Sequence, residues 1–433
     1  MTYRPVIDQF VVPVPLDPPS AAIFIAALLG AAFLTARRPA YGLCALILAT
    51  PIAFAHEIFG TTLTLEKSVL LGVLLGLTTY AGAGKELRNR PAPLLLGALG
   101  LYFVATALTM TGAAHPGATT REMLKVVQYA AVFVAGFSCY RLDADDAPLV
   151  GAAAIAAIAV ACSALAQEII GAPSGLYIGP AIVPRIAGIL EGPNQLSAYC
   201  EIAVATLGAW AFVRRTALLD TALVLIVCAD VLSFSRAGLF GLAVVAATLA
   251  IVGGKAAWHA LRPAMLGAIA GLAGSAGWAI YAHTPGVLRI SLQPSLYAGG
   301  VGNRDVLWRA AGRMWLDRPI FGVGAGNFEL ELPQYGALGV RTHANSWYLQ
   351  SLAEGGIVLF AATIALLAAV LATLTQGVVG RLRGASPWIV AALAASIALA
   401  LHQVVDYLVF YPKVGGAWWL LVGIGAAAIS RRS

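Results

Sequence analysis

The chain has 433 residues, of which 60% are apolar and 11% are charged, less than half the charged share of an average soluble domain. The apolar residues form blocks of about 17–23, each long enough to cross a hydrocarbon core as a helix. These blocks exclude a soluble enzyme, a nucleic-acid-binding protein and a small disulfide-stapled secreted domain. The net charge of +7 is typical of the basic loops that orient membrane proteins.

We therefore predict an all-α polytopic membrane protein, with residues 1–433 in one integral membrane domain. The first nineteen residues show no pattern of a cleavable signal peptide. There are 13 predicted transmembrane helices, or 12 if one terminal segment only dips into the membrane interface. The predicted spans lie at 20–36, 40–58, 68–84, 94–112, 124–142, 148–170, 193–213, 216–234, 237–254, 264–283, 345–372, 388–410 and 414–430.

Short basic connections follow every second span. They contain Arg37 and Arg38, then Lys85, Arg88 and Arg90, then Arg141, Arg214 and Arg215, Lys255 and Arg262, Arg381 and Arg383, and Arg431 and Arg432. By the positive-inside rule all of these connections face the cytoplasm, and so does the C-terminus.

This topology leaves three notable stretches on the opposite side of the membrane: residues 171–192, the turn at Ser235 and Arg236, and the long loop 284–342. Loops of that length are commonly functional. Within it, residues 303–318 (NRDVLWRAAGRMWLDR) predict an amphipathic helix with Asn303 as its N-cap.

The long loop is rich in arginine. It contains Arg289, Arg304, Arg309, Arg313, Arg318 and Arg341, against the acids Asp305, Asp317, Glu329 and Glu331. The planar fork of arginine binds phosphate oxygens in pairs and keeps its charge. The cluster therefore suggests an anionic ligand such as a diphosphate, and the alternative is a solvated basic loop partly paired with its acids. Trp308 and Trp315 are explained as interface anchors.

Two further cations lie outside the long loop. Arg185 precedes Asn194 in the first outer stretch, and Arg236 is either a site cation or a residue that reaches to the outer surface.

Polar residues also continue into the next span. His343, Trp347, Gln350 and Glu354 share one helical face where the chain re-enters the bilayer. Because polar residues inside spans are costly, such a face commonly lines a cavity or a site. A histidine at its mouth can act as a general base near neutral pH, and the alternative is an interface histidine bonded to the backbone.

Other chemistries have little support. The five cysteines form no C-x-x-C pair, and His56, His115, His259, His283 and His402 lack metal-ligand spacing. The glycine run GVGAGNF lacks the strand and helix of a nucleotide-binding loop. The intramembrane acids Glu201, Asp230 and Asp406 serve either a proton relay or packing. We expect no metal and no other cofactor.

With these residues in view, the chain resembles the O-antigen ligase and O-antigen polymerase family of bacterial envelope enzymes. The span layout is similar along nearly all of its length, and the specific strings lie between about 183 and 360. They are PRIAGILEGPNQLSAY, LSFSRAGL, GNRDVLWRAAGRMWLDRPIFGVGAGNF and THANSWYLQSLAEGGIVLF. Many members have a second histidine after the first, where this chain has Asn345.

The resemblance implies a membrane glycosyltransferase of the GT-C type. Such enzymes move a glycan from an undecaprenyl diphosphate carrier to an acceptor hydroxyl, such as that of lipid A core, at the periplasmic face of the inner membrane and without a metal. It implies His343 as the catalytic base and Arg185 and Arg304 as diphosphate ligands, with Arg309 or Arg236 assisting. The supporting residues would be Asn194, Asn345, Gln350 and Glu354.

Three alternatives stay open beside the ligase: a repeat-unit polymerase of the same family, a transporter or flippase for a lipid-linked sugar, and a structural scaffold. The expected partners are a polyprenyl-diphosphate-linked glycan, a lipid or glycan acceptor and membrane lipids, and no nucleic acid. The oligomeric state is left open.

Overall fold

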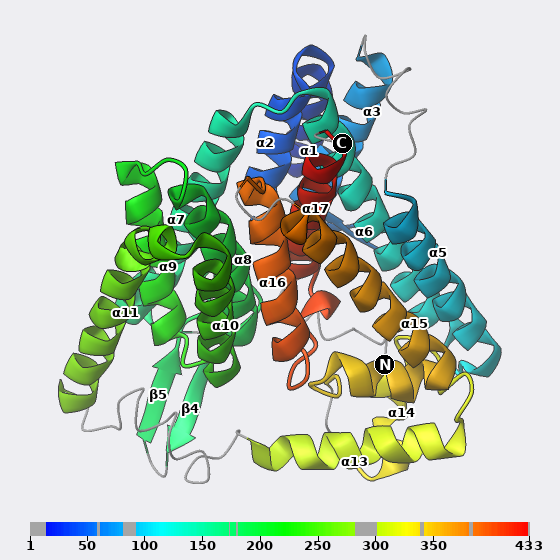
Figure 1. Ribbon diagram of the computed structural model, residues 1–433. Helices are drawn as coiled ribbons and strands as arrows, with labels where there is room; N and C mark the ends of the chain where they lie inside the picture. The colour runs from blue at the N-terminus through cyan, green and yellow to red at the C-terminus, as the bar shows by residue number, and fades with distance from the viewer. Residues whose placement is uncertain are drawn as a thin grey trace.

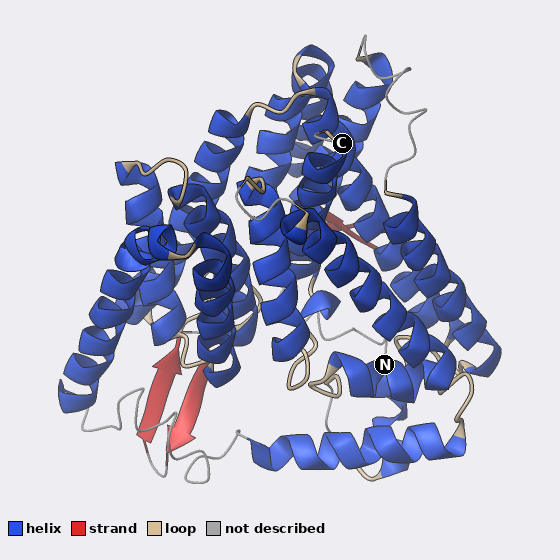
Figure 2. Cartoon of the chain, in the orientation of Figure 1, coloured by secondary structure: helices blue, strands red, loops and turns tan. Residues whose placement is uncertain are grey.

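The computed structural model describes residues 14–58, 61–80, 92–172, 174–178, 181–281, 301–337, 342–380 and 384–431. These residues form a bundle of helices with two small sheets, which confirms the predicted all-α class (Figures 1 and 2). The long helices of the bundle are α1 (Pro18–Arg37), α2 (Pro39–Ala49), α3 (Leu65–Thr79), α5 (Pro93–Leu108), α6 (Pro116–Leu142), α7 (Asp146–Ile170), α8 (Pro193–Ala211), α9 (Ala217–Leu232), α10 (Arg236–Gly253), α11 (Lys255–Tyr281), α15 (Trp347–Val379), α16 (Pro387–His402) and α17 (Pro412–Ser430).

The shorter elements lie at the ends of these helices. They are α13 (Val301–Asp317), α14 (Phe328–Glu331) and the 3-10 helices η2 (Thr109–Gly112), η4 (Leu332–Tyr335) and η5 (Leu408–Phe410). Strand β1 (Val14–Pro15) pairs in parallel with β2 (Ala55–Ile58), which pairs antiparallel with β3 (Thr61–Thr64). Strands β4 (Ser174–Ile178) and β5 (Ala181–Arg185) form an antiparallel hairpin in which Ser174 lies opposite Arg185.

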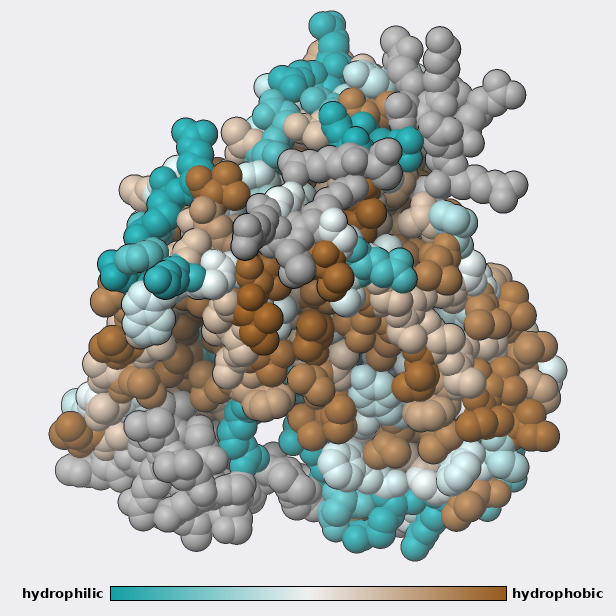
Figure 3. Space-filling view, viewed as in Figure 1, coloured by the Kyte–Doolittle hydropathy of each residue, from teal (hydrophilic) through white to brown (hydrophobic). Residues whose placement is uncertain are grey.

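Among the described residues, eight helical segments are long and apolar enough to cross a membrane: α1, α5 continued by η2, α6, α7, α10, α11, α15 and α17. Figure 3 shows a hydrophobic band across the visible face, with hydrophilic side chains gathered towards its two ends. This arrangement is that of a polytopic membrane protein, because the apolar surface meets the lipid and the polar ends meet water.

The helices at the centre of the bundle are α8, α16 and α17, which are buried along most of their length. Small residues allow them to approach their neighbours closely. At Gly423 of α17, for example, a Cβ atom would lie 2.5 Å from the carbonyl oxygen of Phe133 on α6. Helices α1 and α11 lie at the periphery and expose apolar side chains such as Phe33 and Ile269.

The predicted span at 40–58 is wrong in its second half. Helix α2 ends at Ala49, and the strands β2 (Ala55–Ile58) and β3 (Thr61–Thr64) pair with each other instead. Pro51 explains the stop, because proline disfavours helix at the residue before it and cannot donate a backbone hydrogen bond.

Two other predicted boundaries also change. Helix α16 ends at His402, so the predicted span 388–410 is too long, and the polar residues Gln403 and Asp406 interrupt it. Helix α13 begins at Val301, so Asn303 lies inside the helix and is not its N-cap. The capping preference of asparagine is weak compared with the continuation of an established helix. Residues 284–300 and 338–341 of the predicted long loop, with Arg289 and Arg341, lie outside the described residues.

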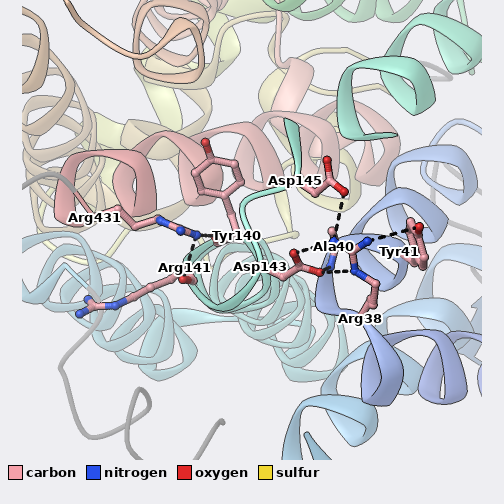
Figure 4. A network of polar contacts seen from close by, with 8 residues as sticks. All are labelled: Arg38, Ala40, Tyr41, Tyr140, Arg141, Asp143, Asp145 and Arg431. Carbon is pink, nitrogen blue, oxygen red and sulfur yellow. Dashed lines mark hydrogen bonds and ion pairs between the residues drawn. The ribbon is translucent and has the colours of Figure 1, made fainter. Parts of the chain in front are cut away.

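One end of the bundle carries α13 and the β4–β5 hairpin, and we call it the α13 end (Figure 1). The opposite end is held by arginines of the predicted basic connections (Figure 4). Arg38, between α1 and α2, forms ion pairs of 3.1 Å with Asp143 and with Asp145 in the α6–α7 turn. Arg431 donates to the Tyr140 carbonyl at 3.0 Å, so the end of α17 is tied to the end of α6.

Candidate functional site

Arg185 is the last residue of β5, and the hairpin holds it against α8 and α9 at the α13 end. Its Nε donates to the Ser233 carbonyl at 2.9 Å, and one Nη donates to the side-chain oxygen of Asn194 at 3.0 Å. Ser233 caps the end of α9, and Asn194 lies in the first turn of α8. The guanidinium is therefore fixed between two helices.

Asn194 links Arg185 to Asp406, which lies in the segment between α16 and η5. The Asn194 amide donates to one Asp406 carboxylate oxygen at 2.6 Å, and the other oxygen accepts from the Tyr407 backbone at 2.7 Å. The Asp406 carbonyl in turn accepts from the Trp347 N–H at 3.0 Å. This chain of bonds connects β5 with the start of α15, where His343 lies.

Two more arginines approach Arg185. Arg236 is the first residue of α10, after the N-cap Ser235, and Arg304 lies near the start of α13. Burial is the largest cause that lowers the pKa of Arg185; Asp406 raises it, the positive charges of Arg304 and Arg236 lower it, and together these effects bring it to about 10. Arg185, Arg236 and Arg304, which we call the arginine group, are thus close enough to repel one another.

Arg309 does not join the arginine group. It forms an ion pair of 2.8 Å with Asp305, one helical turn away, and its side chain is 63% exposed. The face of α13 that packs inward is apolar instead, with Leu307, Ala311 and Met314 buried. Of the arginines predicted on α13, Arg304 is the one brought to the site.

His343 lies in the short segment before α15, and its ring is buried among the rings of Tyr407, Phe410 and Tyr411, with centroids 5.6–5.8 Å away. Nδ1 accepts from the Asn345 backbone at 3.1 Å, and Nε2 lies 3.1 Å from the Tyr411 hydroxyl. Asn345 has a φ of 48°, in the left-handed region that asparagine tolerates, which turns its N–H towards the ring.

This hydrogen bonding determines the protonation of the ring. Because Nδ1 accepts an N–H, the neutral imidazole of His343 carries its proton on Nε2 and donates it to the Tyr411 hydroxyl. Burial lowers the pKa of His343, the positive charges of Arg304 and Lys125 lower it further, and Asp406 opposes them. The ring is therefore neutral near pH 7.

Gln350 and Glu354 support the segment that carries His343. The Gln350 side-chain oxygen accepts from the Ala344 backbone at 2.7 Å, and its amide donates to Glu354 at 2.8 Å. The same Glu354 oxygen accepts from the Phe328 backbone at 3.1 Å. Gln350 and Glu354 both belong to the predicted polar face. Their hydrogen bonds hold the segments 342–346 and 319–328 next to each other.

The glycine run identified in the sequence belongs to residues 319–328, which we call the glycine segment. It packs along α15 where that helix is broken at Gly356, which has a φ of 57°. Gly324 donates to the Glu354 carbonyl at 2.8 Å, and the Ile357 N–H donates to the Pro319 carbonyl at 2.8 Å. Gly322 has a φ of 62°. The glycine segment is therefore held against α15 by backbone hydrogen bonds, and we call this set of contacts the backbone clamp.

Gly322→Ala should destabilise this clamp. The substitution places a side chain in the left-handed region and brings its Cβ against the backbone of Glu354. The free energy of unfolding should fall by at least the roughly 1–2 kcal/mol that left-handed backbone costs an ordinary residue. Thermal unfolding in detergent measures the loss. Gly312→Ala on α13 is the matched control, since its Cβ would meet no atom within 4 Å; equal losses in both proteins would contradict the clamp.

Tyr411 and the bond between Asn194 and Asp406 are not among the predicted features of the site. Both depend on the segment 403–411, most of which lies at the end of the predicted span 388–410. The polar and aromatic string QVVDYLVFY in that segment was the available signal. Among the described residues, no group of three or more His, Cys, Asp or Glu side chains is arranged to hold a metal ion.

Part of the chain matches a known protein family. Residues 221–364 match the family model described as O-antigen ligase, which covers about a third of the chain. The matched segment runs from α9 into α15, so it contains Arg236, Arg304 and His343, while Arg185 lies before it. No curated protein matches the chain.

Proposed function

We propose, from the match of residues 221–364 to the O-antigen ligase family model, that the chain is a ligase-like glycosyltransferase. It moves a glycan from an undecaprenyl diphosphate carrier to an acceptor hydroxyl, such as one of lipid A core. It lies in the bacterial inner membrane with its C-terminus in the cytoplasm, and the reaction occurs at the periplasmic face. The observation that supports this most is that hydrogen bonds through Asn194 and Asp406 link Arg185 to the start of α15, next to the segment that carries His343.

The arginine group suits the diphosphate of the donor. Its three side chains come from β5, α10 and α13, and their positive charges repel one another. A bound anion would relieve this repulsion. An arginine fork binds phosphate oxygens through two parallel hydrogen bonds. These side chains would stabilise the charge that grows on the diphosphate as its bond to the sugar breaks.

His343 suits the acceptor side of the reaction. In a direct displacement, the acceptor oxygen bonds to the anomeric carbon, the bond from that carbon to the phosphate oxygen breaks, and the hydroxyl proton goes to His343. The neutral ring can take that proton only at Nδ1, so the hydroxyl replaces the Asn345 N–H there. The diphosphate leaves unprotonated, and a single displacement inverts the anomeric configuration. Asn194 orients Arg185, and Gln350 and Glu354 position the His343 segment.

A transporter or flippase would need charged groups along a path through the bilayer. Two buried acids inside the bundle are instead bonded to polar neighbours: Glu201 lies 2.6 Å from His402 Nδ1, and Asp230 accepts from Ser197. The arginine group lies at one end. This one-sided placement favours chemistry at that end over translocation.

Ligase and polymerase share the donor and differ in the acceptor, so the polymerase remains the second candidate. Purified protein should be incubated with an undecaprenyl-diphosphate-linked oligosaccharide, with and without lipid A core and in the presence of EDTA. Glycan on lipid A core supports the ligase, and longer lipid-linked chains support the polymerase. Retention of the anomeric configuration in the product would exclude the direct displacement, and absence of any transfer would contradict the proposed function.

A further inference from the structure

A cavity of about 490 Å³ lies between α3 and α6, and we call it the α3–α6 cavity. Its volume falls within the roughly 300–1,000 Å³ that is usual for ligand pockets. His343, Gln350 and Glu354 form part of its wall, whereas Arg185 and the rest of the arginine group do not line it. His343 therefore borders this cavity, and the arginine group lies outside it.

The cavity opens towards the lipid. Leu71 of α3 and Leu124 and Val127 of α6 line it, and each of these side chains is also about half exposed on the outer surface of the bundle, at 50%, 56% and 51%. Deeper in the cavity the apolar lining continues with Leu70 and Leu74. In a polytopic protein such a sideways opening admits a molecule that is anchored in the bilayer.

The charged groups around the cavity are nearly balanced. Its lining includes four basic residues and five glutamates. Lys125 pairs with Glu122 at 2.7 Å, and Lys413 lies 3.4 Å from Glu191. A wall of this kind provides no excess positive charge for a phosphate, but it offers many hydrogen-bond donors and acceptors to hydroxyl groups.

From these observations we propose that the α3–α6 cavity binds the acceptor, and that the acceptor is a membrane glycolipid whose attacking sugar carries no phosphate. The sugar lies against His343, Lys125 and Glu122, and the lipid chain leaves between Leu71, Leu124 and Val127. This inference rests on the proposed function. The proposal places the binding sites of the donor and the acceptor on opposite sides of His343. Under this proposal the acceptor is neither a protein nor a free soluble sugar.

The test narrows the cavity without touching a charged residue. Ala131 of α6 lines the cavity, and Ala131→Phe fills it; Leu124→Trp, at the opening, is the second variant in case the first fails to fold. The matched control is Ala250→Phe on the exposed face of α10. Transfer rates are measured against acceptor concentration and donor concentration separately, once with lipid A core and once with a lipid-linked repeat as acceptor.

We expect the acceptor KM to rise at least tenfold in both cavity variants, with the donor KM within twofold of the unmodified protein and no change in Ala250→Phe. A second readout needs no turnover: a photoreactive glycolipid with an uncharged disaccharide should label α3 and α6, and Ala131→Phe should reduce this labelling at least fivefold. Unchanged acceptor KM, or labelling elsewhere, would overturn the acceptor site. Specific labelling of α3 and α6 without any transfer would instead contradict the proposed function and leave the binding site standing.

Discussion

Arg185→Ala and Arg304→Ala should each lower the rate of glycan transfer by about 10²–10³-fold, the loss seen when one preorganised donor to a developing negative charge is removed. Arg185 is fixed by Ser233 and Asn194, so its fork is already aimed before the donor binds. Arg304 lies near enough to both Arg185 and His343 to lower the pKa of each. The measurement is the initial rate of transfer at saturating donor and acceptor.

The control for this prediction lies on the same helix. Arg309→Ala should stay within about twofold of the unmodified rate, because Arg309 is exposed and paired with Asp305. Arg185→Lys keeps the positive charge but loses the planar guanidinium that donates to both Ser233 and Asn194. Its transfer rate should therefore be only slightly higher than that of Arg185→Ala. If Arg304→Ala and Arg309→Ala had equal effects, general attraction of an anion by a basic surface would explain the data instead.

The helices could be predicted from the sequence because their apolar blocks are long and separated by charged connections. The predicted span ends were wrong where a single residue ends a helix inside an apolar stretch. Residues 50–58 are apolar enough to extend a span, yet Pro51 ends α2 and the chain turns into strands. The break in α15 at Gly356 is also invisible to hydropathy, because it depends on the glycine segment packing against that turn.

The candidate site was predictable in part for a topological reason. Arg185, Arg236, Arg304 and His343 all lie in connections on the same side of the predicted membrane, so they share one surface without any knowledge of packing. The partners of these residues could not be predicted. Asn194 meets Asp406 across 212 positions of sequence, and Tyr411 meets His343 across 68. Such pairs follow from how α8, α16 and α17 pack, which the local sequence pattern does not contain.

His343→Ala and His343→Gln should both lower the transfer rate by about 10²–10⁴-fold, the usual contribution of a general base. The glutamine variant is the sharper test. Its amide can still donate to the Tyr411 hydroxyl in place of Nε2–H, but it cannot take up a proton. If His343→Gln kept the unmodified rate, the ring would act only as a hydrogen-bond donor, which is the role its present contacts already provide.

The dependence of the transfer rate on pH is a second way to distinguish a general base from a hydrogen-bond donor at His343. A base must be unprotonated, and burial together with Arg304 and Lys125 lowers the pKa of His343 below its ordinary value of 6.5. The unmodified rate should therefore hold as the pH falls through 6.5 and decline only at lower pH, as the ring becomes protonated. The residual activity of His343→Gln should lack this decline. Tyr411→Phe removes the Nε2 partner but leaves Nδ1 free to accept a proton, so it should retain the decline; an identical profile in all three proteins would remove His343 from the proton transfer.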